Sequence, residues 1–298
     1  MPGVVAAANT LNDNEALGPA FFEVAVDVVD DVTGDQVAAV TAAYLDNLHT
    51  ENNPHTENYT GYRAGLTVRH ADNVFTVDSG SRPVTNRDQI LGQARSWVAL
   101  RQQFAGGTVT LDAAIGHAGD PPGQPPGPAG SVQLPDTADH AGVAAAVGTL
   151  ASRFGDLTSG DWTITAGKQH PAEIRTSKRL PTPAEMDVWT ALNIDQTIPH
   201  AVVFTINGAA TGPFWASEKI PTHDPNTAVR LAERHLPIVA RLPAPVLYSA
   251  TDQFRGHIGF HGQATGPVTI LIGGCMKRDY RPSEAEQALI DRYETCRR

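Results

Sequence analysis

A run of proline and glycine near the middle of the chain sets the strongest limit on its fold. The stretch GDPPGQPPGPAG, residues 119–130, contains five prolines and four glycines among twelve residues. Proline removes backbone hydrogen-bond donors and glycine offers no side chain to pack, so regular helix or strand is disfavoured there. Because long structureless loops are uncommon inside compact domains, we expect a linker over residues 118–138. A long loop across a single domain is the alternative.

This linker predicts two domains on either side of it. The chain has 298 residues, of which 41% are hydrophobic and 18% are charged, a mixture that can bury two ordinary cores. Residues 1–19 are small, polar and aperiodic, and we expect a flexible tail there. The predicted domains then cover residues 20–117 and 139–298.

The N-terminal part shows strand and helix periodicities in turn. From Phe22 to Val28, apolar and polar residues alternate, which is typical of a strand with one wet face. The elements expected after it are a helix over 35–48, strands over 65–70 and 74–78, a helix over 85–104 and a strand over 108–113. This order, βαββαβ, is the order of ferredoxin-like domains.

The C-terminal part alternates strands with helices more regularly. Helices are expected over 139–154, 183–192, 225–240 and 282–296, and strands over 162–166, 173–176, 201–206, 214–218, 246–249, 258–261 and 268–272. Similar segments, each leading from a strand into a helix through Pro and Ser or Thr, occur at 78–88, 176–186, 216–226 and 277–287. They indicate either a repeated ββα unit or a shared preference for Ser and Thr as helix caps. The overall class is α+β, with antiparallel or mixed sheets backed by helices.

Charge and hydropathy exclude several classes of partner. The formal net charge is -10 and no run of Lys or Arg interrupts it, which argues against a nucleic-acid backbone as partner. The first residues lack the basic start of a secretory signal, and no stretch approaches the ~18 apolar residues of a membrane span. We expect a cytoplasmic protein in which Cys275 and Cys296 are free thiols, although the two could pair.

A tetrapeptide repeated around Asn53-Pro54 is the first candidate metal site. The sequence HTENNPHTEN, residues 49–58, supplies His49, Glu51, His55 and Glu57 as ligands if the loop folds back on itself. Helix termination and a proline turn explain most of this segment without a metal. Both interpretations stay open at this stage.

The second candidate site combines His257, His261 and Cys275. Three glycines around the histidines favour a strand, along which four residues span ~13 Å, so one ion could not reach both imidazoles. The predicted hairpin instead brings Cys275 near His257, and a cysteine beside His257 or His261 could act as a thiolate nucleophile. A small buried cysteine at the end of an apolar strand is the structural alternative.

Three hypotheses for function follow. The first is a binding or assembly protein without chemistry of its own, favoured because no phosphate-loop, dinucleotide or CxxC motif occurs. The second is a hydrolase or transferase that uses Cys275 with His257 or His261. The third is a metal- or haem-containing tandem ferredoxin-like protein, with His200 or His170 as axial haem ligand. No cofactor is identified; the expected partner is a protein or a small molecule, and homo-oligomerisation is open.

Overall fold

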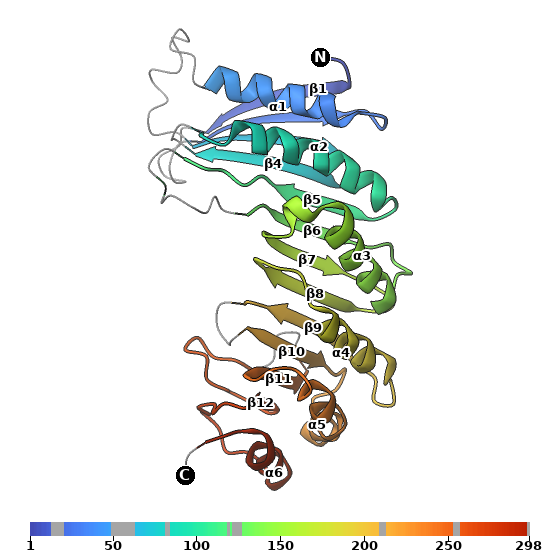
Figure 1. The fold of residues 1–298 in the computed structure, drawn as a ribbon, viewed down its shortest axis with the longest axis vertical. Coiled ribbons are helices and arrows are strands. Elements are labelled where there is room, and N and C mark those ends of the chain that lie inside the picture. The colour runs from blue at the N-terminus through green and yellow to red at the C-terminus, as the bar shows by residue number, and fades with distance from the viewer. Residues whose placement is uncertain are drawn as a thin grey trace. The chain divides into compact units, whose positions relative to one another are not determined.

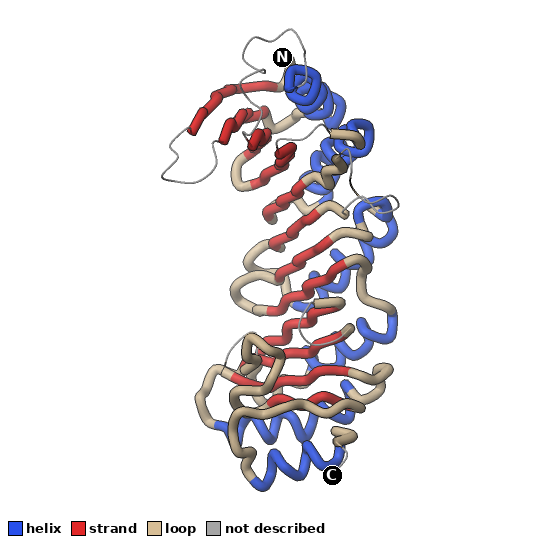
Figure 2. The backbone as a smooth tube through the Cα atoms, turned by 90° about the vertical axis from the view of Figure 1, so that its left-hand side faces the viewer, coloured by secondary structure: helices blue, strands red, loops and turns tan. Residues whose placement is uncertain are grey.

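A computed structural model describes residues 1–12, 21–48, 63–80, 84–117, 120, 127–208, 213–252 and 257–296. The chain divides into two compact units. The N-terminal unit comprises residues 1–133 and 154–160, and the C-terminal unit comprises residues 134–153 and 161–298. Each unit is a sheet with its helices on one face (Figures 1 and 2).

In the part of the N-terminal unit that the structure describes, there are six strands and two long helices. In chain order they are β1 (Val4–Asn12), β2 (Phe21–Val28), α1 (Gly34–Leu48), β3 (Arg63–His70), β4 (Asn73–Gly80), α2 (Arg87–Gln103), β5 (Thr108–Asp112) and β6 (Ala129–Gln133), with a short 3-10 helix at Gly155–Leu157. The strands lie side by side in sequence order. Three antiparallel hairpins, β1–β2, β3–β4 and β5–β6, are joined by the parallel pairs β2–β3 and β4–β5.

The C-terminal unit repeats this plan. Its elements are α3 (His140–Arg153), β7 (Asp161–Thr165), β8 (Ala172–Ser177), α4 (Pro183–Ile194), β9 (Ala201–Ile206), β10 (Phe214–Lys219), α5 (Pro225–Val239), β11 (Val246–Thr251), β12 (Thr269–Ile272) and α6 (Glu284–Tyr293). The hairpins β7–β8, β9–β10 and β11–β12 are antiparallel, and the neighbouring pairs β8–β9 and β10–β11 are parallel. A helix therefore follows each hairpin as the chain crosses to the next one.

Alternation along the strands places the core between sheet and helices. In β4, Phe75 and Val77 are buried while their neighbours Thr76 and Asp78 are not, which is the period of two expected of a strand covered on one face. Phe75 packs with its ring centroid 6.2 Å from that of Trp97 in α2. In the C-terminal unit, Trp189 of α4 meets Phe204 of β9 edge to face at 5.0 Å.

The α+β class predicted from the sequence is confirmed, and the sheets are mixed. The ferredoxin-like arrangement is not confirmed, because β2 and β3 are direct neighbours, whereas a split βαβ unit would hold another strand between them. Two further strands stand in stretches that were expected to be irregular. β1 lies within the predicted tail, and β6 lies within the predicted linker, where it pairs with β5 once the prolines have ended.

The late hairpin expected over 258–261 and 268–272 also differs. Only Thr269–Ile272 becomes a strand, and it pairs with β11. Ile258 makes a single bridge to Ala264, and the segment folds over the sheet face where Leu247, Ala264 and Met276 are buried together. Glycines that favour close backbone approach also weaken strand structure, which accounts for the difference.

No helix among the described residues is long and apolar enough to cross a lipid bilayer.

Candidate metal centre

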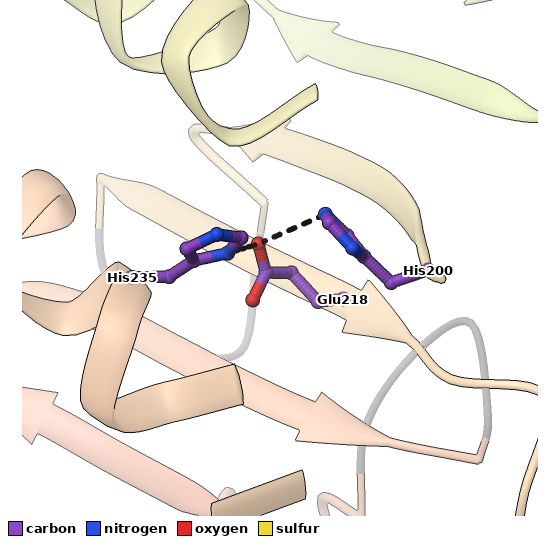
Figure 3. A group of neighbouring side chains, drawn as sticks. All are labelled: His200, Glu218 and His235. Carbon is purple, nitrogen blue, oxygen red and sulfur yellow. Dashed lines mark hydrogen bonds and ion pairs between the residues drawn. The ribbon is translucent and has the colours of Figure 1, made fainter. Parts of the chain in front are cut away.

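Three side chains that are far apart in sequence converge in the C-terminal unit. One ligand atom each from His200, Glu218 and His235 lies within 4.8 Å of the other two (Figure 3). The three side chains have no exposed surface at all. Buried charge without a partner is very unfavourable, so this cluster must balance its own charge.

Each residue is brought there by the local pattern of its element. Phe214, Ala216 and Glu218 are buried on one face of β10, so Glu218 occupies a position where the strand pattern calls for an apolar residue. His235 lies on the buried stripe of α5, next to Leu231 and Ala232. An apolar helix stripe packed on a sheet thus places an imidazole over a carboxylate.

His200 comes from the loop that joins α4 to β9. Within that loop, the Gln196 side chain bridges two backbone groups: its Nε2 donates to Asn193 O at 3.1 Å, and its Oε1 accepts from His200 N–H at 3.4 Å. Asp195 accepts from the backbone N–H of Thr197 at 3.1 Å, as in an Asx turn. These contacts fix the loop and turn the His200 ring toward Glu218.

The distances in the cluster suit a small cation. Nδ1 of His235 is 2.6 Å from Oε1 of Glu218, and Nε2 of His200 is 3.7 Å from the same oxygen. Zinc bonds to nitrogen and oxygen are ~2.0–2.2 Å, so tetrahedral ligand atoms stand about 3.4 Å apart. These two separations lie on either side of this value, and all three ligand atoms lie within 4.8 Å of one another.

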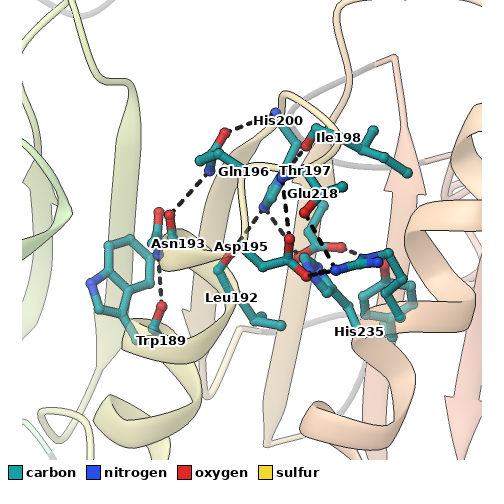
Figure 4. Close-up of polar contacts among 12 residues, drawn as sticks. Trp189, Leu192, Asn193, Asp195, Gln196, Thr197, Ile198, His200, Glu218 and His235 are labelled. Carbon is teal, nitrogen blue, oxygen red and sulfur yellow. Dashed lines mark hydrogen bonds and ion pairs between the residues drawn. The ribbon is translucent and has the colours of Figure 1, made fainter.

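The second polar atoms of His200 and Glu218 have hydrogen-bond partners, whereas that of His235 has only a charged neighbour, Asp195 (Figure 4). Nδ1 of His200 lies 2.7 Å from Ile198 O. Nε2 of His235 lies 3.5 Å from Oδ2 of Asp195, beyond a good hydrogen bond but within ion-pair range. The Tyr248 hydroxyl donates to Oε2 of Glu218. Metal-bound histidines are typically oriented in this way, by a carboxylate or a backbone carbonyl on the second ring nitrogen.

His200 has an acceptor near both of its ring nitrogens. Besides the Ile198 contact, its Nε2 is 3.1 Å from Leu192 O, one of the carbonyls at the end of α4. A neutral imidazole donates from one nitrogen only, so both contacts are hydrogen bonds only in the doubly protonated ring. Nε2 therefore already has an oxygen at hydrogen-bond distance, and a metal ion bound at Nε2 would replace this contact.

The charges around His235 favour a positive group at this ring. Burial disfavours the charged imidazole, but the hydrogen bond and charge of Glu218, with the charge of Asp195, outweigh it and raise the pKa of His235.

Burial, followed by the Glu218 charge, raises the pKa of Tyr248 well above its usual value, so this hydroxyl stays a donor. Hydrogen bonds from Thr197 and Arg234 lower the pKa of Asp195. Arg234 contacts Asp195 at 2.7 Å and balances its charge.

The cysteine and histidines named from the sequence are placed differently. Cys275 forms a disulfide with Cys296, with the sulfurs 2.09 Å apart, whereas free thiols were expected. His257 contacts Asp252, with Nε2 3.1 Å from Oδ1, beside His223. His261 lies in an exposed turn against Phe260. A disulfide sulfur is not a thiolate, so Cys275 as it stands here cannot serve as a nucleophile.

The remaining named residues divide between three places. His49, Glu51, His55 and Glu57 lie outside the described residues. His170 is exposed in a turn, with its N–H donating to Gly167 O. His200 does belong to the cluster, although the sequence suggested it only as one of two haem ligands.

Sequence reasoning missed Glu218 and His235. A signal existed for both: each is a titratable residue at a position that the strand or helix period assigns to the core. No spacing motif connects them, because the three ligands come from a loop, a strand and a helix.

No protein-family model matches the chain, and neither a curated protein nor a solved structure gives a match.

Proposed function

We propose that this protein binds one divalent transition-metal ion, with zinc as the best match, through His200 Nε2, His235 Nδ1 and one oxygen of Glu218. The observation that carries the proposal is the set of outer partners. Ile198 O lies 2.7 Å from Nδ1 of His200, and the Tyr248 hydroxyl donates to Oε2 of Glu218, so both contact atoms other than the ligand atoms. Oδ2 of Asp195 lies 3.5 Å from Nε2 of His235, within ion-pair range but without a hydrogen bond. Such partners fix ring orientation and raise ligand basicity at metal sites.

The donor types favour zinc over other common ions. Two imidazoles and one carboxylate are borderline ligands that suit zinc, whereas calcium and magnesium take oxygen ligands. The three ligand atoms lie within 4.8 Å of one another, a spacing that fits a single ion. This spacing favours a single-ion site over the haem alternative. Because Oε2 of Glu218 accepts from the Tyr248 hydroxyl, the fourth ligand of a tetrahedral ion would be a buried water.

Complete burial supports a structural role for the ion. Substrates reach catalytic zinc through an open coordination position, but the three ligand side chains here have no exposed surface. The ion would tie the α4–β9 loop, β10 and α5 together inside the C-terminal unit. The protein then acts as a metal-stabilised binding or assembly protein, whose metal performs no chemistry.

Metal titration of the full-length protein tests this proposal. Protein freed of metal with a chelator should take up one zinc per chain, and its Tm should rise because the ion binds the folded state only. At a free zinc concentration of 100 Kd the expected stabilisation is about 2.7 kcal/mol. Cobalt in place of zinc should give the visible spectrum of a tetrahedral nitrogen and oxygen site.

Matched variants identify the residues responsible. His235→Gln should abolish uptake, whereas His261→Ala removes an exposed imidazole and should leave it unchanged. A variant with His49→Ala and His55→Ala controls for the repeated HTEN segment. Uptake that survives His235→Gln and disappears in the HTEN variant would place the metal elsewhere and contradict the proposal.

A further inference from the structure

The first strand of the N-terminal unit has an open edge. β1 is nine residues long, the longest strand among the described residues, and β2 is its only partner there. An edge strand presents a row of backbone N–H and C=O groups that can pair with another chain. Proteins usually protect such edges with short strands, charges, prolines or covering segments.

The last strand of the C-terminal unit shows that protection. β12 has four residues, its Leu271 N–H donates to Oε1 of Glu294 at 3.0 Å, and the N–H of Gly273 just beyond it donates to Tyr293 O at 2.9 Å. Among the described residues, no segment covers β1 in this way. Its sequence, VVAAANTLN, contains neither a charge nor a proline, and its one protective feature is a bulge near Val5 that interrupts the ladder with β2.

Exposed apolar side chains gather on the same strand. Five large hydrophobic residues are exposed in the described part of the chain, and three of them, Met1, Val5 and Leu11, lie on β1 or just before it. Val5 is 67% exposed and Leu11 is 50% exposed. Such a concentration along an open edge indicates a surface that is covered in an assembly.

We propose that β1 pairs antiparallel with β1 of a second copy across a two-fold axis. With the axis at Ala8, Ala6 faces Thr10, and Leu11 of each copy lies across from Val5 of the other. The contact between Val5 and Leu11 then occurs twice, as an isologous interface requires. Because β1 is uncharged, two chains of net charge -10 can meet here without opposing like charges on the paired strands.

A second copy fits this edge better than a different protein. Backbone pairing supplies affinity in strand addition, while side-chain pockets or charges supply selectivity. β1 carries small and apolar side chains with no charge to select a partner, and pairing about Ala8 places its two exposed large apolar residues, Val5 and Leu11, opposite each other. The interaction does not depend on the proposed metal.

Light scattering after size-exclusion chromatography, over a dilution series, tests the pairing. The wild-type protein should elute with twice the mass of one chain. A double variant with Val5→Lys and Leu11→Lys should elute with the mass of one chain at every concentration. Charges on an edge strand oppose pairing without disturbing a buried core.

Another pair of exposed hydrophobics gives the matched control. Ile194→Lys with Phe260→Lys changes residues that are 67% and 98% exposed and should leave the dimer intact. Circular dichroism melts confirm that both double variants fold. A wild-type protein of single mass, an open-ended series of larger species, or a dimer that survives both β1 lysines would overturn the proposal.

Discussion

Buried tyrosine hydroxyls contact Ser79 in the N-terminal unit and Glu218 in the C-terminal unit, with opposite consequences; Tyr44 does so from helix α1 and Tyr248 from strand β11. Each buried tyrosine hydroxyl meets a polar residue near the end of a hairpin's second strand: Ser79 on β4 and Glu218 on β10. Tyr44 and Ser79 are neutral, 3.0 Å apart, and Ser79 also donates to Ala64 O. Burial, chiefly, raises the pKa of Tyr44 to about 12. Two hydroxyls and one carbonyl therefore satisfy each other without any ion.

Glu218 cannot be satisfied in this way. A buried carboxylate requires a cation, and the C-terminal unit surrounds it with two imidazoles. The same fold position thus holds a closed neutral pair in one unit and a charged centre in the other. The ββα arrangement therefore permits a buried polar residue at this position. A neutral residue such as Ser79 needs only hydrogen bonds there, whereas a charged residue such as Glu218 also needs a positive partner.

Replacing the Glu218 carboxylate should have the largest effect on the free energy of unfolding. Glu218→Gln leaves His235 buried without its anion, and losing one partner of a buried pair costs about 3–5 kcal/mol. Ser79→Ala deprives only a neutral hydroxyl of its partner, at about 1–3 kcal/mol. Chemical unfolding of both variants with a chelator present measures the difference. Equal losses in the two variants would show that the cluster carries no special charge balance.

The outer partner of His235 should have an intermediate effect. Asp195→Asn keeps the shape of the side chain but removes the charge 3.5 Å from Nε2 of His235. Zinc affinity should fall about 10- to 100-fold, as expected when such a partner is lost. Competition with a chromophoric chelator measures the change, with Asp35→Asn, at an exposed carboxylate paired to Arg95, as the control. An unchanged affinity would mean that Asp195 serves only to hold Arg234 and the loop at Thr197.

The dependence of stability on pH should show the smallest effect, because it involves chiefly one proton. The raised pKa of His235 means that the folded metal-free protein holds this proton more tightly than the unfolded chain. The resulting stabilisation is complete below the unfolded value of about 6.5 and is lost as pH rises through the folded pKa. Zinc displaces protons, so its stabilisation should grow over the same rise in pH.

Melts of zinc-loaded and metal-free protein at several pH values measure both trends. The difference between the two Tm values should widen from pH 6 to pH 8. A constant difference would indicate that zinc does not compete with the His235 proton. Tyr44 and Ser79, which lack any group that titrates in this range, should contribute nothing to the trend.

The sequence by itself determined most helices and strands, because their signals are local. The capping box at Thr182 and Glu185 is present in full, with Pro183 in the first turn, and α4 begins where that pattern predicts. The strands expected over 201–206 and 214–218 are likewise present as β9 and β10. The start of α2 was less well signalled: Thr85 does not cap it, and the helix begins at Arg87 after Asn86.

Only the tertiary structure decided strand neighbours and the site. His200, Glu218 and His235 come from a loop, a strand and a helix, and parallel pairing of β10 with β11 then adds Tyr248. Period and capping act over a few residues, whereas contact between separate elements depends on how the sheet is ordered and which face the helices cover. The physical reason is the sequence distance over which each effect acts. Backbone preferences depend on neighbouring residues, whereas the convergence of three side chains depends on how separate elements pack.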